Sequence, residues 1–331
     1  MAYTGTAYGD ISPRTGGYAS KELLKRAQPL LVIEKFLQSQ PLPERSTKTM
    51  IFRRYNALDA TPTPLSEGVT PTGKKLTKTD VTVDLVQYGD FVEISDIIQD
   101  HHTDPVLQET MAILGEQAAL MLETVRFGVL KAGTSVTYAN GAARTDVNTG
   151  ITLDLQRRVT RALKRQNARV FTSVVRSTPD FGTVNVAPSF IGLCHTDCES
   201  AIRGLAGFKP VEDYGNYGAI YEGEIGKVED VRYVASTVFL PWADAGGLKG
   251  TMLSTAGTNA DVYPILYLAR DAAASVPFKG KKAVTPMVLN PNVPRGGDPL
   301  GQRGSCGWKA ASAAVILNDA WMHRLEVAVP A

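Results

Sequence analysis

The chain has 331 residues, of which 44% are hydrophobic and 21% charged, and its formal net charge is +2. This composition is typical of a folded globular protein, and the small net charge excludes a general polyanion binder, so any contact with nucleic acid must come from a local patch. Three cysteines without framework spacing argue against a secreted disulfide scaffold and favour a reducing compartment.

The N-terminal part of the chain predicts an arm followed by a helix. Residues 1–20 are polar and lack the apolar region of a signal peptide, and no run of about 18 uncharged apolar residues occurs anywhere, so no membrane contact is expected. The arm is either a frayed terminus or a segment that orders against another subunit. Ser20 is a good N-cap for a helix to about Gln38, with a kink at Pro29.

Residues 47–57 and 78–96 predict a long two-stranded ribbon, because apolar and polar residues alternate along both. The intervening stretch, 58–78, holds too many prolines and glycines for regular structure, and EGVTPTG (67–73) is expected at the tip. The apolar positions change from odd to even numbers along the second strand, which predicts a bulge or bend near Gly89.

The strongest helix signal follows the ribbon. Asp104 is a good N-cap, Pro105 suits the first helical position, and Gly133 is a natural stop after Lys131. A helix over about 105–132 would be roughly 40 Å long at 1.5 Å per residue. Its apolar stripe is wider than a coiled-coil seam, which favours a long core helix over a coiled coil.

The rest of the chain predicts a mixed α+β arrangement. Residues 134–150 form a turn-rich connection in which Asn140-Gly141 is a hairpin signal. Helices are expected over about 154–167 and 199–205, and strands over 171–177, 188–197, 227–237, 263–271, 311–318 and 321–329.

An isolated two-stranded ribbon is marginally stable in water. Since the next element is a long straight helix, the ribbon has no obvious surface of its own chain to lie on. We therefore expect its missing core to belong to another copy of the protein. Such a heterologous contact closes into rings or propagates into larger arrays, which predicts a lattice-forming subunit.

Long blocks of the sequence resemble a known family. They are GYASKELLKRAQPLLVIEKF, PLSEGVTPTGKKLTKTDVTVDLVQYGDFVEISDIIQD, DPVLQETMAILGEQAALMLETVRFGVLKAGT, GEIGKVEDVRYVAST and GDPLGQRGSCGWKAASAAVILNDAWMHRLEV. Together they resemble the N-four-type family of tailed-phage major capsid proteins, with the Hong Kong 97-like capsid fold. The likeness spans about residues 18–328 and is loose over 170–220.

The resemblance implies a domain plan and a function. Residues 1–45 would form the N-arm and first helix, 46–96 the E-loop ribbon, 97–189 the P-domain with the spine helix, 190–290 the A-domain, and 291–331 the return to the core. Many copies would assemble in the host cytoplasm as hexamers and pentamers into an icosahedral virion shell around double-stranded DNA. Portal, scaffolding or decoration proteins are further implied partners.

Two groups of residues are candidate contact sites. Ribbon contacts between subunits are expected at Arg53, Arg54, Glu67, Lys74, Lys75, Lys78, Tyr88 and Phe91. Arg53 and Arg54 should point to opposite faces of a strand, so that one of them meets an acidic group on a neighbour. The second group is a run of cations on the helix after the connection, Arg157, Arg158, Arg161, Lys164 and Arg165. It is either a solvated face or subunit contact, or an inner-surface patch for DNA phosphates.

No catalytic, metal or cofactor site is predicted. Cys194-His195-Thr196-Asp197-Cys198 offers four possible ligands, but a zinc site needs a second cluster, so turn and core roles are favoured. A monomeric metal-dependent hydrolase built on this cluster remains one alternative function. An encapsulin-like nanocompartment shell, with the same fold and an enzyme cargo, is the other.

Overall fold

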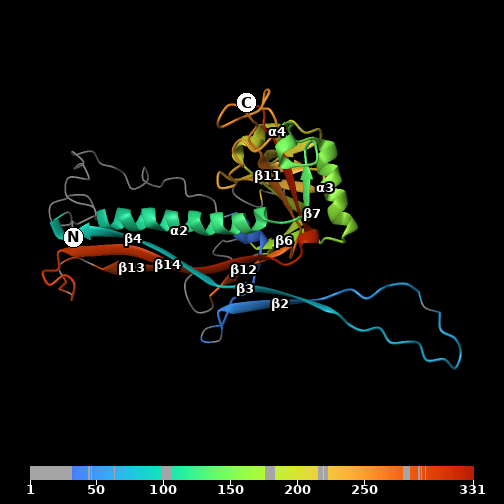
Figure 1. Ribbon diagram of the computed structural model, residues 1–331, viewed down its shortest axis with the longest axis horizontal. Helices are drawn as coiled ribbons and strands as arrows, with labels where there is room; N and C mark the ends of the chain where they lie inside the picture. The colour runs from blue at the N-terminus through green and yellow to red at the C-terminus, as the bar shows by residue number, and fades with distance from the viewer. Residues whose placement is uncertain are drawn as a thin grey trace.

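The computed structural model describes residues 32–43, 45, 47–62, 64–97, 106–175, 183–214, 219, 223–278, 284–289, 291, 293–294 and 296–331. Figure 1 shows an elongated molecule with a compact lobe, a flat layer of strands beneath one long helix, and a narrow ribbon that runs past the lobe. The predictions for residues 1–31, the Asp104 cap and Pro105 lie outside the described residues.

The lobe is built on an eight-stranded sheet. Its order is β5 (Val136–Tyr138), β15 (Met322–Val327), β11 (Tyr263–Leu268), β7 (Thr183–Cys194), β10 (Val231–Ala235), β9 (Glu224–Val228) and β8 (Phe208–Pro210), and β6 (Phe171–Val175) also pairs with β7. Helices α3 (Leu153–Arg165) and α4 (Glu199–Arg203) pack on one face. The 3-10 turns of this region are η2 (Arg144–Asp146), η3 (Thr196–Cys198), η4 (Val211–Tyr214) and η5 (Asp319–Trp321).

Alternate residues of the central strands fill two separate cores. On β11, Tyr263 and Ile265 face α3, whereas Leu266 and Leu268 face the opposite core. That second core also receives η1 (Ile33–Phe36) and the end of the long helix. The helix predictions over 154–167 and 199–205, and the strands predicted over 171–177, 263–271 and 321–329, are confirmed to within a few residues. The single strand predicted over 227–237 is wrong, because a turn at Glu229 and Asp230 divides it into the antiparallel pair β9 and β10. The strands predicted from 188 and from 311 begin earlier, at Thr183 and Arg303.

Two other local predictions in or near the lobe are wrong. Asn140-Gly141 does form a turn, with Gly141 at φ +70°, but β5 pairs in parallel with β15 and no hairpin forms there. Gln38 does not end a helix: it begins β1 (Gln38–Ser39), which pairs in parallel with β12. Neither pairing could be deduced locally, because both partners lie far away in the chain.

The flat layer, called the platform here, consists of a five-stranded sheet and helix α2 (Val106–Lys131). At its centre, β14 (Arg303–Ile316) pairs with β4 (Val86–Ser95) and, on its other edge, with β13 (Val284–Leu289) and β12 (Ala273–Pro277). The 26 residues of α2 span about 39 Å. Leu114, Ala118 and Leu122 on one side of the helix pack against Cys306 and Trp308 of β14, as expected of a core helix.

The ribbon comprises β2 (Thr49–Tyr55) and β3 (Lys78–Asp84), paired in antiparallel register from Thr49–Asp84 to Tyr55–Lys78. The predicted second strand is thus two strands. The break falls at Leu85 and not near Gly89, and beyond it β4 leaves the ribbon to pair with β14. The change of apolar parity marks this exchange of partners, not a bulge within one ladder.

Candidate assembly surfaces

The base of the ribbon is anchored on its own chain. Met50, Phe52 and Val83 share one face and pack, with Leu85, against a small core of Leu42, Val276 and Ala313. The expectation that the apolar face of the ribbon rests wholly on another copy is therefore wrong for this part. Its own platform supports it instead.

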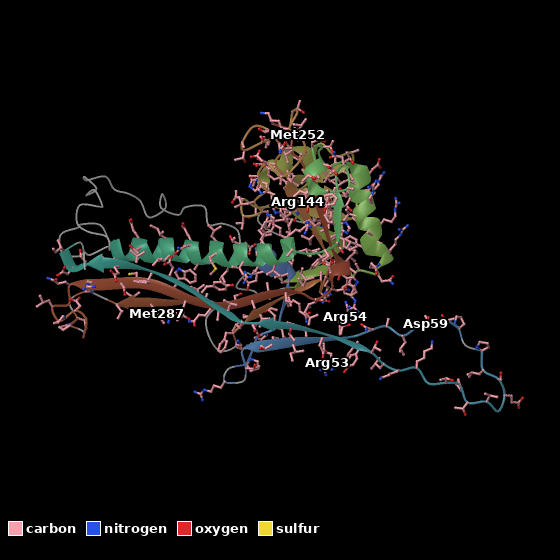
Figure 2. The ribbon with its side chains drawn as sticks, viewed as in Figure 1. Arg53, Arg54, Asp59, Arg144, Met252 and Met287 are labelled. Carbon is pink, nitrogen blue, oxygen red and sulfur yellow. The ribbon has the colours of Figure 1, made fainter. Side chains whose placement is uncertain are left out.

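The opposite face of the ribbon carries an ion cluster. Arg53 donates two hydrogen bonds to Asp80, at 2.8 and 3.2 Å, and Lys78 Nζ lies 3.0 Å from the same carboxylate. The hydrogen bonds from Arg53 are the main reason that the pKa of Asp80 is lowered to about 2. Arg53 and Lys78, predicted as contacts to a neighbour, are thus both paired within the ribbon: Arg53 links β2 to β3, and Lys78 pairs within β3. Arg54 lies exposed on the other face, and the two arginines are labelled in Figure 2.

Beyond β2 and β3 the chain continues as the distal loop, residues 56–77, in which the described part has no regular structure. Its large apolar side chains are exposed: Leu58 by 54%, Leu65 by 74%, Val69 by 66% and Leu76 by 56%. The tip turns at Gly68, where φ is +75°, as the sequence predicted. This loop presents apolar surface that the described chain does not cover.

The charged residues of the distal loop differ in their surroundings. Lys74 Nζ donates to the carbonyl oxygen of Asp59 at 2.5 Å and so ties the two sides of the loop together. Glu67 and Lys75 are exposed and make no ion pair with any described residue. Of the three, Glu67 and Lys75 are therefore free to make the contact with a neighbouring copy that the sequence predicts.

A second apolar surface lies on the face of the platform sheet away from α2, and is called the sheet patch here. Phe91 on β4, Gly307 on β14 and Met287 on β13 stand directly opposite one another in the register. Phe91 is 64% exposed, and Met287 and Leu289 are each 47% exposed. A Cβ on Gly307 would lie 2.8 Å from Cβ of Phe91, so glycine is needed for this close approach.

The sheet patch corrects the assignment of two predicted ribbon contacts. Tyr88 and Phe91 belong to β4, in the platform, and not to the ribbon. Tyr88 packs on the α2 side, against the core of the platform, so only Phe91 remains an exposed candidate. Sequence reasoning missed Met287 and Leu289, because no strand was predicted over β13 and an apolar run does not tell whether it is covered.

Helix α3 bears two rows of cations. In the first row, Arg157 contacts Glu229 at 2.5 Å, and Lys164 pairs with Asp230; both acids lie in the β9–β10 turn. The second row, called the arginine row here, is Arg158, Arg161 and Arg165, spaced three and four residues apart on one side of the helix. All three are exposed, and none makes an ion pair within the described part of the chain. The predicted five-residue patch is therefore two surfaces with different surroundings.

The Cys194–Cys198 cluster is part of the lobe core. Both thiols are buried, and burial raises the pKa of each, that of Cys198 to about 12. His195 Nδ1 accepts a hydrogen bond from the backbone of Asp197, whose carboxylate accepts one from Tyr263. Among the described residues no group of three or more His, Cys, Asp or Glu side chains is arranged to hold a metal ion. The hydrolase alternative therefore gains no support here. No helix in the described ranges is both long and apolar enough to cross a membrane.

Buried charged residues fix the last turns of α2, next to the lobe, at two points. Glu123 accepts the backbone N–H groups of Val32 and Ile33 at 2.9 and 2.7 Å, and burial raises its pKa. At the C-terminus, Arg324 donates to the carbonyl oxygens of Lys131 and Gly133. These contacts hold the helix rigidly against the lobe.

Lys131, where α2 meets the lobe, lies close to another cation, Arg144. Its Nζ is 3.9 Å from the ring centroid of Trp242, over which the guanidinium of Arg144 also lies, at 3.5 Å. Burial is the main reason that the pKa of Lys131 is lowered to about 8, and Arg144 adds to it. Arg144, labelled in Figure 2, is in turn held by two hydrogen bonds to the buried Glu326.

Comparison with known proteins identifies the family of this elongated subunit. The sequence model of a family described as phage capsid protein matches residues 78–285. The chain belongs to this phage capsid protein family. Its role is therefore structural, as part of a virion shell built from many copies. No curated protein matches the sequence.

Solved structures agree on the fold. The capsid of Ralstonia phage GP4 superposes with a TM-score of 0.72 at 12% identity, covering 100% of this chain and 99% of that one. The capsid of cyanophage Pam1 gives 0.66 at 12% identity, with both chains covered completely. The holo-SrpI encapsulin complex of Synechococcus elongatus gives 0.56 at 12% identity, covering 92% and 89%. The predicted α+β capsid fold of the Hong Kong 97 type is confirmed.

Proposed function

We propose that this chain is the major capsid protein of a tailed phage of the N-four type, and that its copies form hexamers and pentamers of an icosahedral head around double-stranded DNA. The observation that carries the proposal is a pair of exposed apolar surfaces at opposite ends of one elongated chain. Figure 1 places the distal loop beyond the lobe, whereas β13 and the free end of the platform extend the other way.

The distal loop of one copy covers the sheet patch of the next. Four apolar side chains of the loop, each more than half exposed, have no cover on the described chain, and neither do Phe91, Met287 and Leu289. Burial of a Leu or Val side chain stabilises by about 1.5–3 kcal/mol. Because the two surfaces are different and far apart, the contact is heterologous and passes from copy to copy around a ring.

The domain names follow from this arrangement. Residues 1–45 are the N-arm, 46–96 contain the E-loop, 97–189 and part of 291–331 are the P-domain, and 190–290 supply most of the A-domain. Since β4 pairs with β14, the E-loop proper is limited to β2, the distal loop and β3. Portal, scaffolding and decoration proteins are further partners in this proposal, with assembly in the host cytoplasm.

The test is a loop replacement with a cargo assay. Asn56 and Thr77 are joined by a backbone hydrogen bond of 3.0 Å, so residues 58–76 can be exchanged for an Asn-Gly turn without disturbing the ribbon strands. The shortened chain should fold as a subunit and form no particles, whereas the full chain forms shells. Normal shells from the shortened chain would refute the role of the loop.

The likeness to an encapsulin makes cargo the deciding readout. Native particles isolated from the producing cells should contain nuclease-protected double-stranded DNA. A packaged enzyme and no DNA would favour a nanocompartment shell. That outcome would leave the fold and the loop contact intact while replacing the phage function.

A further inference from the structure

The charges of this chain are separated along its length. From Thr79 to Val125 the sequence contains ten Asp or Glu residues and no Lys or Arg. Two of these acids, Asp80 and Asp84, belong to β3 and pair with cations of the ribbon. Those on β4 and α2 belong to the platform. In contrast, residues 157–169 contain six Lys or Arg and no acid. The net charge of +2 hides this polarity.

Four acids of the platform have no cationic partner among the described residues. Asp90, Glu93, Asp96 and Glu116 make no ion pair with a described residue; Asp90 accepts a hydrogen bond from Gln117 at 2.7 Å. Across the sheet, β14 provides Arg303 and Lys309, fewer charges than the acids. The free end of the platform therefore remains acidic.

The arginine row on α3 has the opposite character. The neighbouring cations Arg157 and Lys164 are neutralised by the β9–β10 turn, but Arg158, Arg161 and Arg165 are not neutralised within the described chain. Guanidinium groups form planar, two-pronged contacts with carboxylates and are less strongly hydrated than ammonium groups, so they suit interfaces. The row offers such contacts along one side of the helix.

The position of α3 decides which partner meets this row. Figure 1 shows α3 on the flank of the lobe towards which the distal loop extends. If the distal loop of one copy lies on the platform of the next, that platform comes alongside this flank. The separation of charges along the chain therefore brings the acidic platform of the second copy to the arginine row of the first.

We propose that the arginine row of α3 binds carboxylates on the α2 side of the platform, Asp90 and Glu116, in the adjacent copy of this chain. The proposal rests on the proposed shell function and adds a second, electrostatic contact to the apolar loop contact. Complementary charges steer association and fix the register of two copies, so this contact selects the correct neighbour geometry. It assigns the row to the subunit interface and not to packaged DNA.

The test compares three sets of variants in shell assembly from purified subunits. Arg158→Gln/Arg161→Gln/Arg165→Gln should reduce particle yield at least tenfold at about 0.1 M salt, and the yield of the unaltered chain should fall towards about 1 M, where screening is strong. The matched control, Arg157→Gln/Lys164→Gln, removes cations that are already paired within the chain, and should assemble like the unaltered protein. Unchanged thermal midpoints of the isolated subunits show that each variant folds.

A charge exchange makes the test specific. Arg158→Glu/Arg161→Glu/Arg165→Glu should abolish assembly, and adding Asp90→Lys/Glu116→Lys to the same chain should restore particles at least in part. Normal shells from the Gln triple variant, with a loss of nuclease-protected DNA, would overturn the proposal and assign the row to the genome. Failure of the exchange to restore any particle would overturn the platform as partner. Absence of shells from the unaltered chain would instead refute the proposed function itself.

Discussion

Replacing the apolar side chains of the distal loop should abolish particle formation while leaving the subunit folded. The variant is Leu58→Ser/Leu65→Ser/Val69→Ser/Leu76→Ser. These side chains are 54–74% exposed and outside every buried core of the described chain, so their loss should cost the monomer almost nothing. Any effect on assembly therefore measures what they contact in a neighbour.

The expected magnitude follows from the area that a neighbour could cover. Full burial of a Leu or Val side chain contributes about 1.5–3 kcal/mol, and between half and three-quarters of each is free to be covered. Each residue then contributes about 1–2 kcal/mol, and the four together about 4–8 kcal/mol per contact. Since about 1.4 kcal/mol is a factor of ten, each contact weakens about a thousandfold or more.

The assay is the fraction of protein in particles as a function of subunit concentration, measured by sedimentation. The control variant, Leu58→Met/Leu65→Met/Val69→Ile/Leu76→Met, keeps the apolar area and should assemble close to normally. The thermal midpoint of the subunit should be the same in both variants. Assembly of the serine variant at the same concentration as the unaltered chain would show that the loop is not an apolar contact.

Three further predictions concern the single subunit. Glu123→Ala should destabilise it by about 3 kcal/mol in urea unfolding, because two buried backbone N–H groups lose their acceptor and the buried Arg126 keeps only Glu34 as an acidic neighbour. The pKa of Lys131 is lowered from 10.5 to about 8, so between these pH values the unfolded chain binds more protons than the folded one. This group therefore makes the free energy of unfolding rise as the pH rises through that range. The thermal midpoint of the unaltered chain should accordingly rise relative to that of Lys131→Met between pH 8 and 10.5. Gly128→Ala should raise the free energy of unfolding by about 0.5–1 kcal/mol, because Gly128 lies in a helix and an added Cβ meets nothing within 4 Å. Gly307→Ala should lower the free energy of unfolding, because its Cβ would lie 2.8 Å from Cβ of Phe91. A rise in both variants would contradict the packing described for the sheet patch.

The sequence predicts elements well where their signals are local. Helix α2 ends near Gly133 as expected, because the stop depends on a few neighbouring residues. The division between β3 and β4 was not predictable in the same way. The change of apolar parity after Leu85 shows that something interrupts the pattern, but an alternating pattern does not identify the partner of a strand. The partner of β4 is β14, more than 200 residues later in the chain.

The candidate surfaces show the same limit. Periodicity predicts that Arg157 and Arg158 lie on the outside of α3, but not that Glu229 neutralises only the first, since the acid comes from a distant turn. Likewise, Arg53 reads as a free cation until the register places Asp80 opposite it. In both cases the exposed residues that remain for a partner are those left over after non-local pairing.

The two kinds of unsatisfied surface on this subunit restrict how copies can associate. A two-fold dimer could pair each surface with its complement on the other copy, but it would leave neither surface free to extend the array. A head-to-tail arrangement instead brings apolar loop to apolar patch and arginine to carboxylate at the same time. Because α2 is fixed to the lobe at both Glu123 and Arg324, the angle between successive copies is set mainly by where the ribbon leaves its anchor at Leu42 and Val276. In the proposed ring, we therefore expect changes at that anchor to alter the number of copies that close it.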